Sequence, residues 1–175
     1  MLPKLIGMIH LAALPGSPRH DGGFAELIES AVVDAKALET AGFDALMIEN
    51  FGDVPFYADD VPKVTVAAMT QAIGRVADAV DLPCGVNVLR NDAEAALSIA
   101  AVTGAGFIRV NVLSGVMYTD QGPIVGRAAQ VARLRSEIAP DVAIMADVFV
   151  KHAAPPPGIT VEQAAEELAG RALAD

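Results

Sequence analysis

Hydrophobic residues gather in five short runs that are separated by segments of helical length. The runs are rich in Val, Ile, Leu and Met, which is typical of buried strands. Their ranges are Lys4–Leu11, Asp44–Asn50, Cys84–Leu89, Phe107–Leu113 and Val142–Val150. Because strand and helix alternate strictly, the pattern predicts parallel strands that are joined by right-handed crossovers.

The segments between and after these runs carry helix signals. Apolar residues recur at a spacing of 3.6 residues in the first segment, which stops at Gly42. Pro62 is expected in the first turn of the second helix, and capping-box patterns open the third and fifth helices. We therefore expect five helices, over residues 25–41, from 59 onward, over 91–104, over 124–138, and from 160 to the end.

The strands have one polar and one apolar face. Arg109 and Asn111 lie on one face of their strand, and Ile108 and Val110 lie on the other. Central strands of an open sheet are covered on both faces and are apolar throughout, whereas barrel strands alternate. A five-stranded doubly wound sheet is the alternative, but the G-x-G-x-x-G fingerprint is missing after the first strand. The pattern thus predicts a single domain, residues 1–175, with a TIM-type (β/α)8 barrel fold.

The number of units is smaller than a complete barrel needs. Five units repeat at a mean spacing of about 35 residues, and eight would need roughly 250–280 residues. We therefore expect the first five units, with units six to eight absent. The sequence leaves three explanations open: a fragment, a half-barrel completed by another copy, or a truncated reading frame. Because five units leave unpaired edges, we expect a homo-oligomer.

Composition narrows the class of protein. The 175 residues are 53% hydrophobic and carry a formal net charge of −10, which argues against nucleic acid and anionic lipid as partners. The lone cysteine, Cys84, indicates a reducing compartment. Pro3-Lys4 and His10 interrupt the first apolar run, so no signal peptide is predicted, and no run is long enough to span a membrane. We expect a cytoplasmic protein that binds a small molecule.

Polar side chains lie where the predicted strands end, which is where TIM-barrel active sites are built. Glu49 and Asp147 are candidate acid/base groups, since a partly desolvated carboxylate suits proton transfer. His10 is a third acid/base candidate, and Lys151 would bind an anion or form a Schiff base. The candidate substrate-binding residues are Asn50, Asn87, Arg90, Asn111, His152 and Tyr118.

Each candidate also has a purely structural interpretation. Arg109 would pair with Glu49 or Asp147 inside the barrel, because buried charges are usually paired. The amides would satisfy polar neighbours, and Lys151 would be a solvated loop residue. His10 and His152 could join the two carboxylates in a divalent-metal site, but no tight ligand spacing supports one, so no cofactor is predicted.

Three loops lie next to these residues. Phe51–Tyr57 brings three aromatic residues and Ser114–Gly126 is bounded by glycine, so both resemble lids over an active site. The alternative is that the aromatic side chains simply pack on the barrel rim. Leu14–Arg19 could hold an anion, although Pro-Gly-Ser-Pro is mainly a turn signal.

Four motifs resemble those of the BtpA family. They are residues 7–18 (GMIHLAALPGSP), 48–56 (IENFGDVPF), 109–122 (RVNVLSG through YTDQG) and 147–153 (DVFVKHA). The resemblance implies a TIM barrel of the ribulose-phosphate-binding type. The family is named for a role in photosystem I biogenesis, occurs also in organisms without photosynthesis, and has no generally established reaction. The loops after strands seven and eight, where such barrels usually hold phosphate, have no counterpart here.

Overall fold

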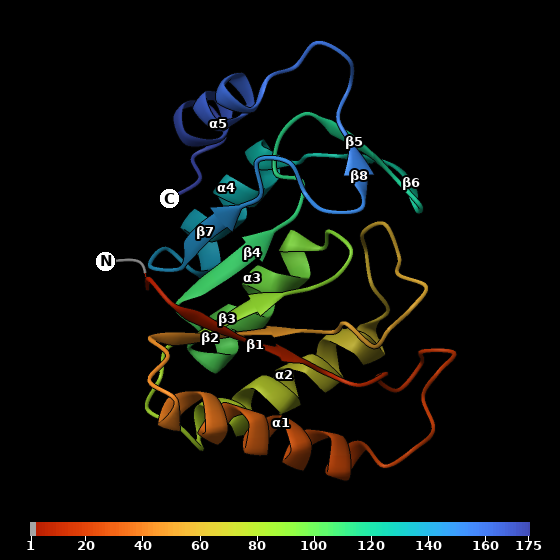
Figure 1. Cartoon of the computed structure of the whole chain (residues 1–175), viewed down its shortest axis with the longest axis vertical. Coiled ribbons are helices and arrows are strands. Elements are labelled where there is room, and N and C mark those ends of the chain that lie inside the picture. The colour runs from red at the N-terminus through yellow and green to blue at the C-terminus, as the bar shows by residue number, and fades with distance from the viewer. Residues whose placement is uncertain (1–2) are drawn as a thin grey trace.

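Five parallel strands form the central sheet of this computed structural model, which describes residues 3–175 (Figure 1). The strands are β1 (Ile6–His10), β2 (Ala45–Glu49), β3 (Cys84–Asn87), β4 (Phe107–Val110) and β7 (Ala143–Ala146). They pair in the order β1-β2-β3-β4-β7, so each strand lies beside the next one along the chain. The predicted alternation and parallel pairing are confirmed. The strands described do not close into a barrel, because β1 and β7 remain at opposite edges.

Helices cover one face of this sheet (Figure 1). They are α1 (Phe24–Thr40), α2 (Lys63–Ala77), α3 (Ala93–Thr103), α4 (Ala128–Ile138) and α5 (Val161–Gly170). The main core joins strand residues such as Ile48 and Ile108 to helix residues such as Ala35 and Ile73. Within residues 3–175, no helix combines the length and the apolar character needed to cross a membrane.

The opposite face of the sheet has its own layer of side chains. Met47, Ala45 and Phe107 pack together there, separately from the main core. The Phe107 ring lies over Gly85, and a Cβ placed at Gly85 would be 2.1 Å from that ring. Two residues further along β2 and β4, the same face becomes polar at Glu49 and Arg109. The predicted division of each strand into a helix-covered face and an inner face is therefore confirmed.

A small antiparallel sheet is the feature that the hydrophobic pattern does not predict. It consists of β5 (Val116–Thr119), β6 (Gly122–Val125) and β8 (Ala153–Ala154), in the order β6-β5-β8. Gly122, at φ 93°, permits the tight turn between β5 and β6. The segment Ser114–Gly126, which resembles a lid in sequence, therefore contains a β-hairpin. The helix predicted from Ile124 begins instead at Ala128, because Ile124 pairs with Met117.

Three further predicted bounds are wrong. The fifth strand ends at Ala146 rather than Val150, and the chain then turns toward β8. Helix α2 begins at Lys63, since the preceding chain is held by a bond from the Val61 N–H to Asp92 (2.8 Å). Helix α5 ends at Gly170 rather than at the end of the sequence.

The last residue lies along the outer edge of β7. The N–H of Asp175 donates to the carbonyl of Ile144 (3.0 Å), and the Ile144 N–H donates to the Asp175 carboxylate (2.9 Å). Arg135 of α4 also binds this carboxylate (2.6 Å). The edge of β7 is thus partly paired by residue 175.

Candidate functional site

Arg109 lies at the centre of a network that joins three strand ends. Its Nε and Nη2 donate to the two carboxylate oxygens of Asp147, at 3.0 and 2.8 Å. Its Nη1 donates to Oε1 of Glu49 at 2.8 Å. The alternation of side chains along β2 and β4 turns Glu49 and Arg109 to the same inner face, and Asp147 directly follows β7. The pairing of Arg109 inside the fold, one of the two interpretations of this residue, is present and involves both carboxylates.

Two amides complete the network. Asn87 donates to Oε1 of Glu49 (2.9 Å), and Asn111 donates to Oδ2 of Asp147 (3.2 Å). Glu49 is only 3% exposed, so its charge must be compensated by these partners. Burial disfavours the charged form of Arg109, but the hydrogen bonds and charges of Asp147 and Glu49 outweigh it and raise the pKa of the guanidinium. Oδ1 of Asn111 is buried and accepts no hydrogen bond from residues 3–175.

His10 lies beside the network at the end of β1. Its Nε2 is 3.6 Å from Oε2 of Glu49, which is its register partner on β2. The ring of Phe51 stacks on the imidazole, with centroids 4.4 Å apart and an interplanar angle of 17°. The His10 side chain is 47% exposed. It is therefore held in position on two sides and is accessible to a ligand on the others.

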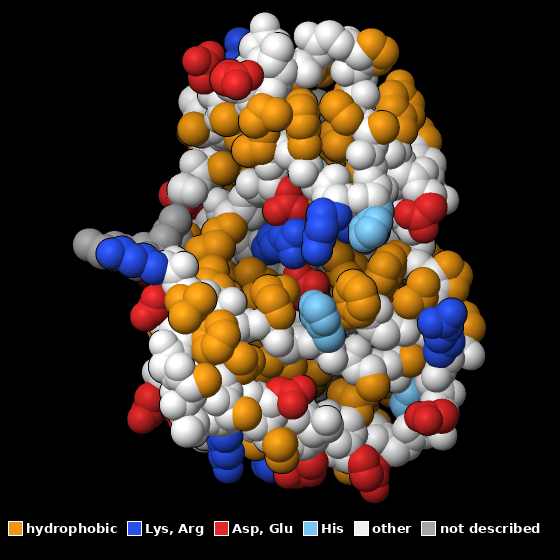
Figure 2. All heavy atoms as spheres, viewed as in Figure 1, with side chains coloured by type: hydrophobic (Ala, Val, Ile, Leu, Met, Phe, Trp, Pro, Cys, Tyr) orange, Lys and Arg blue, Asp and Glu red, His pale blue; other side chains and the backbone are white. Residues whose placement is uncertain are grey.

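Arg90 adds a second buried cation. It donates from Nη2 to the carbonyl of Lys151, and its own N–H donates to the carbonyl of Tyr57 (3.0 Å). Burial lowers the pKa of Arg90, and the nearby positive charge of Arg109 lowers it further, while Asp120 acts in the opposite direction. Lys151 and His152 have exposed side chains. Figure 2 shows basic side chains at the centre of this face, with acidic and histidine side chains next to them.

Asn50 and Tyr118 do not belong to this network. Oδ1 of Asn50 accepts from the N–H of Leu89 (2.7 Å), and its Nδ2 donates to Asp53 (3.1 Å) and to the Leu89 carbonyl (3.4 Å). The side chain of Asn50 thus ties two loops together. Tyr118 is 54% exposed on β5, opposite Ala154 of β8.

Asn91 has a role that the sequence interpretation missed. Its side chain accepts from the N–H of Val112 (2.7 Å) and donates to the carbonyl of the same residue (3.0 Å). Asn91 therefore ties the loop after β3 to the end of β4, as Asn50 does for the previous pair of loops. The cap of α3 is Asp92, which accepts from the N–H of Ala95 (2.8 Å). The sequence signal that could have revealed this role is the position of Asn91 shortly after a predicted strand.

The donor atoms do not fit a divalent metal. Within residues 3–175, no three His, Cys, Asp or Glu side chains gather as a ligand set would require. The guanidinium of Arg109 lies between the two carboxylates and binds both. We therefore assign no step to a metal.

Comparison with known proteins places these features in a family. Residues 2–175 match the model of the BtpA family. The chain is 57% identical over 151 residues to a protein of Thermococcus kodakarensis, covering 85% of this chain and 57% of that one. It is 48% identical to the photosystem I biogenesis protein BtpA of Synechocystis, covering 98% of this chain and 60% of that one.

Two solved structures share the fold. One is 7,8-dihydropteroate synthase from Vibrio fischeri, with a TM-score of 0.55 and 15% identity over 81% of this chain and 43% of that one. The other is dihydrodipicolinate synthase from Thermotoga maritima, with a TM-score of 0.51 and 14% identity over 95% of this chain and 54% of that one. Both neighbours are TIM-barrel enzymes. The chain spans about 60% of the curated relatives it matches, and it belongs to the BtpA family.

Proposed function

We propose that this chain carries part of the active site of a TIM-barrel enzyme that transfers a proton on a small polar or phosphorylated metabolite. The observation that carries the proposal is the network of Glu49, Arg109 and Asp147 at the carboxyl ends of three parallel strands. This is the end at which barrels of this type place their chemistry. The greater length of the relatives supports an eight-unit barrel as the complete form.

In this proposal His10 is the proton-transfer group. Both bonds to Glu49 from Arg109 and Asn87 use Oε1, so Oε2 stays available to accept a hydrogen bond from the imidazole. Glu49 then orients the imidazole of His10. Asp147 commits both oxygens to Arg109 and acts as a positioning residue. This assigns different roles to the two carboxylates that the sequence presents as equivalent.

Arg109 and its basic neighbours would hold the anionic part of the substrate. A guanidinium has five N–H donors, and the network uses three of them. The remaining two can bind a carboxylate or phosphate oxygen in the planar geometry that suits arginine. Arg90 and Lys151 add positive charge on the same side. The proposed ligand therefore carries an anionic group and, near it, a C–H or O–H group that can give up a proton.

Ligand-observed NMR with phosphorylated sugars and hydroxy acids tests this proposal. Arg109→Gln should weaken binding at least tenfold, since a charge-assisted hydrogen bond contributes about 1.5–3 kcal/mol. His10→Gln should leave binding within about twofold but abolish exchange of substrate hydrogen with solvent deuterium. The control is Arg75→Gln, which removes an exposed charge on α2. Equal binding and exchange in all four proteins would reject the proposal.

A non-catalytic role is the second candidate, because the Synechocystis relative is a photosystem I biogenesis protein. In that case the chain acts as an assembly or stability factor through its outer surface. Variants such as His10→Gln should then restore the function of a Synechocystis strain lacking its own protein, while substitutions on the exposed sides of α1 and α2 should not. The reverse result would reject an assembly role.

We further propose that the protein is cytoplasmic and associates with copies of itself. Exposed apolar side chains at the edge of the sheet support association: Met8, on the inner face of β1, is 40% exposed, and Leu5, just before β1, is 51% exposed. Apolar side chains at an unpaired edge favour contact with another chain. Light scattering of the 175-residue chain should detect a dimer or larger species, and a stable monomer at high concentration would contradict this.

A further inference from the structure

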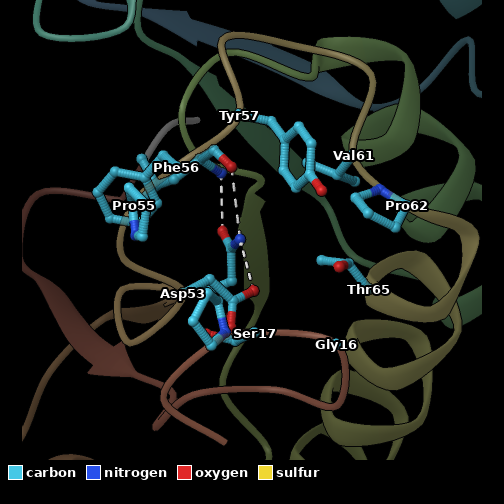
Figure 3. Close-up of a pocket in the computed structure, with 12 residues that line it drawn as sticks. Gly16, Ser17, Asp53, Pro55, Phe56, Tyr57, Val61, Pro62 and Thr65 are labelled. Carbon is cyan, nitrogen blue, oxygen red and sulfur yellow. Dashed lines mark hydrogen bonds between the residues drawn. The ribbon is translucent and has the colours of Figure 1, made fainter.

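A second cavity lies apart from the arginine network. It has a volume of about 300 Å³ and is enclosed by residues 16–18 after β1, residues 55–57 after β2, and the first turn of α2 (Figure 3). None of Glu49, Arg109 and Asp147 is among the described residues that line it. A ligand here would therefore use different contacts from the proposed substrate.

Thr65 places a hydroxyl in this cavity. The residue is 7% exposed, and its side chain points into the cavity from α2 (Figure 3). Its N–H donates to the carbonyl of Pro62 (2.9 Å), and its hydroxyl faces the open cavity. Thr70 on the same helix behaves differently, because its hydroxyl donates to the carbonyl of Val66 (2.7 Å). The Thr65 hydroxyl is therefore available to bond a molecule that occupies the cavity.

The charged residues that line the cavity determine which class of ligand it can bind. Asp53 is its single ionised side chain among the described residues, and no lysine, arginine or histidine lines the cavity. The Asp53 carboxylate is fixed by the Leu14 N–H (2.7 Å) and by Nδ2 of Asn50 (3.1 Å). Each of its oxygens keeps a further lone pair for another donor. A carboxylate without a neighbouring cation repels anions and favours ligands that carry N–H or O–H groups.

Ser17 and Asn50 add polar groups to the lining, and the rest of it is mostly apolar. Phe56, Pro55 and Pro62 contribute to it, and the ring of Tyr57 faces the cavity (Figure 3). Tyr57 is 59% exposed, so it stands at the entrance. Aromatic and proline surfaces favour a planar ring that packs against them. A volume of about 300 Å³ is at the small end of the range for small-molecule sites.

We propose that this cavity binds a small, uncharged, planar ring bearing N–H donors, of the size and chemistry of a nucleobase. A ring amine would donate to Asp53, the Thr65 hydroxyl would bond a ring nitrogen or carbonyl, and Tyr57 would cover one face of the ring. The proposal stands independently of the proton-transfer function. It gives the two loops that the sequence marked as a lid and as an anion-binding turn a shared role as the walls of a neutral-ligand site.

Calorimetric titration with adenine and cytosine tests the proposal on the full 175-residue chain, with benzoate as an anionic ring of similar size. At least one neutral ring should bind with a dissociation constant of about 1 mM or lower, and benzoate at least tenfold more weakly. Thr65→Val should weaken binding about three- to tenfold, the value of one hydrogen bond. Thr70→Val is the matched control and should not change the affinity, because the Thr70 hydroxyl is satisfied within its own helix.

Two further variants show where the ring binds and provide a second test if Thr65→Val does not fold. Arg109→Gln should leave the affinity for the neutral ring unchanged, because Arg109 does not line the cavity, whereas a ring held at the arginine network should bind at least tenfold more weakly. Tyr57→Leu, at an exposed position that the fold does not need, should weaken binding even if Thr65→Val fails to fold. The proposal is overturned if neither base binds, if benzoate binds as well, or if the Thr65 and Tyr57 variants match the wild-type protein.

Discussion

The coupling between Arg109 and Glu49 gives the sharpest test of the network. Arg109→Met keeps most of the side-chain volume but removes the three N–H donors that hold the two carboxylates. Removing one partner of a buried ion pair costs about 3–5 kcal/mol, because the other charge is left uncompensated. Asp147 keeps 22% of its side chain exposed, so water can reach it. We therefore expect the lower end, about 3 kcal/mol.

The effect of Glu49→Gln on the free energy of unfolding should have opposite signs in the wild-type chain and in the Arg109→Met chain. In the wild-type chain it weakens the bond to Arg109 and should cost about 1–2 kcal/mol. In the Arg109→Met chain it removes an unpaired buried charge and should stabilise the fold by about 1 kcal/mol. The coupling energy of the cycle is then about 2–3 kcal/mol, well above the usual error of such measurements.

Urea unfolding followed by circular dichroism measures the four free energies of unfolding at one protein concentration. The matched control is the exposed pair of Arg75 and Glu29, whose atoms are 3.6 Å apart. The same two changes there should give a coupling below about 0.5 kcal/mol. If Glu49→Gln destabilises both backgrounds equally, Arg109 does not compensate the charge of Glu49 and the interpretation of the network is wrong.

Three other predictions concern the scaffold of the site. Asn91→Ala should lower the free energy of unfolding by about 2 kcal/mol in urea titrations, since a backbone N–H and a carbonyl at the end of β4 lose their partner; an unchanged midpoint would contradict this. Gly85→Ala should cost about 1–3 kcal/mol because its Cβ meets the Phe107 ring, whereas Gly106→Ala, with open space around it, should change little; equal effects would refute the packing argument. Burial raises the pKa of the Cys84 thiol above its ordinary value, to about 11. Labelling with a thiol reagent at pH 8 should therefore be slow until the protein unfolds, and stability should fall between pH 9 and about 11 as the unfolded state releases its proton first; rapid labelling of the folded chain would disprove this burial.

The sequence predicts the strands and their inner faces well because a covered and an uncovered side leave a period-two pattern. Arg109 and Asn111 interrupt an apolar strand at that period, and this places Arg109 beside Glu49 and Asp147. The hairpin around Gly122 is missed because Ile124 and the residues after it also suit a helix. Local propensity cannot distinguish the two, and pairing with Met117 decides.

The roles of the amides depend on contacts distant in sequence. Asn50 binds Leu89, 39 residues away, and Asn91 binds Val112, 21 residues away. Nothing near either residue in the sequence distinguishes an amide that faces a ligand from one that holds a loop. The direction of the Thr65 hydroxyl is likewise visible only in three dimensions, whereas Thr70, further along α2, donates its hydroxyl to the carbonyl of Val66.

The apolar layer of Met47 and Phe107 has a consequence for the arginine network above it. It lies two residues before Glu49 and Arg109 on the same strands, about 7 Å below the charged groups. The ring of Phe107 fills the space over Gly85, and the layer stays open toward β1, where Met8 is 40% exposed. Packed apolar atoms beneath β3 and β4 keep water away from one side of the Arg109 guanidinium. The ion pairs of Arg109 with Glu49 and Asp147 are therefore stronger than the same pairs would be in water.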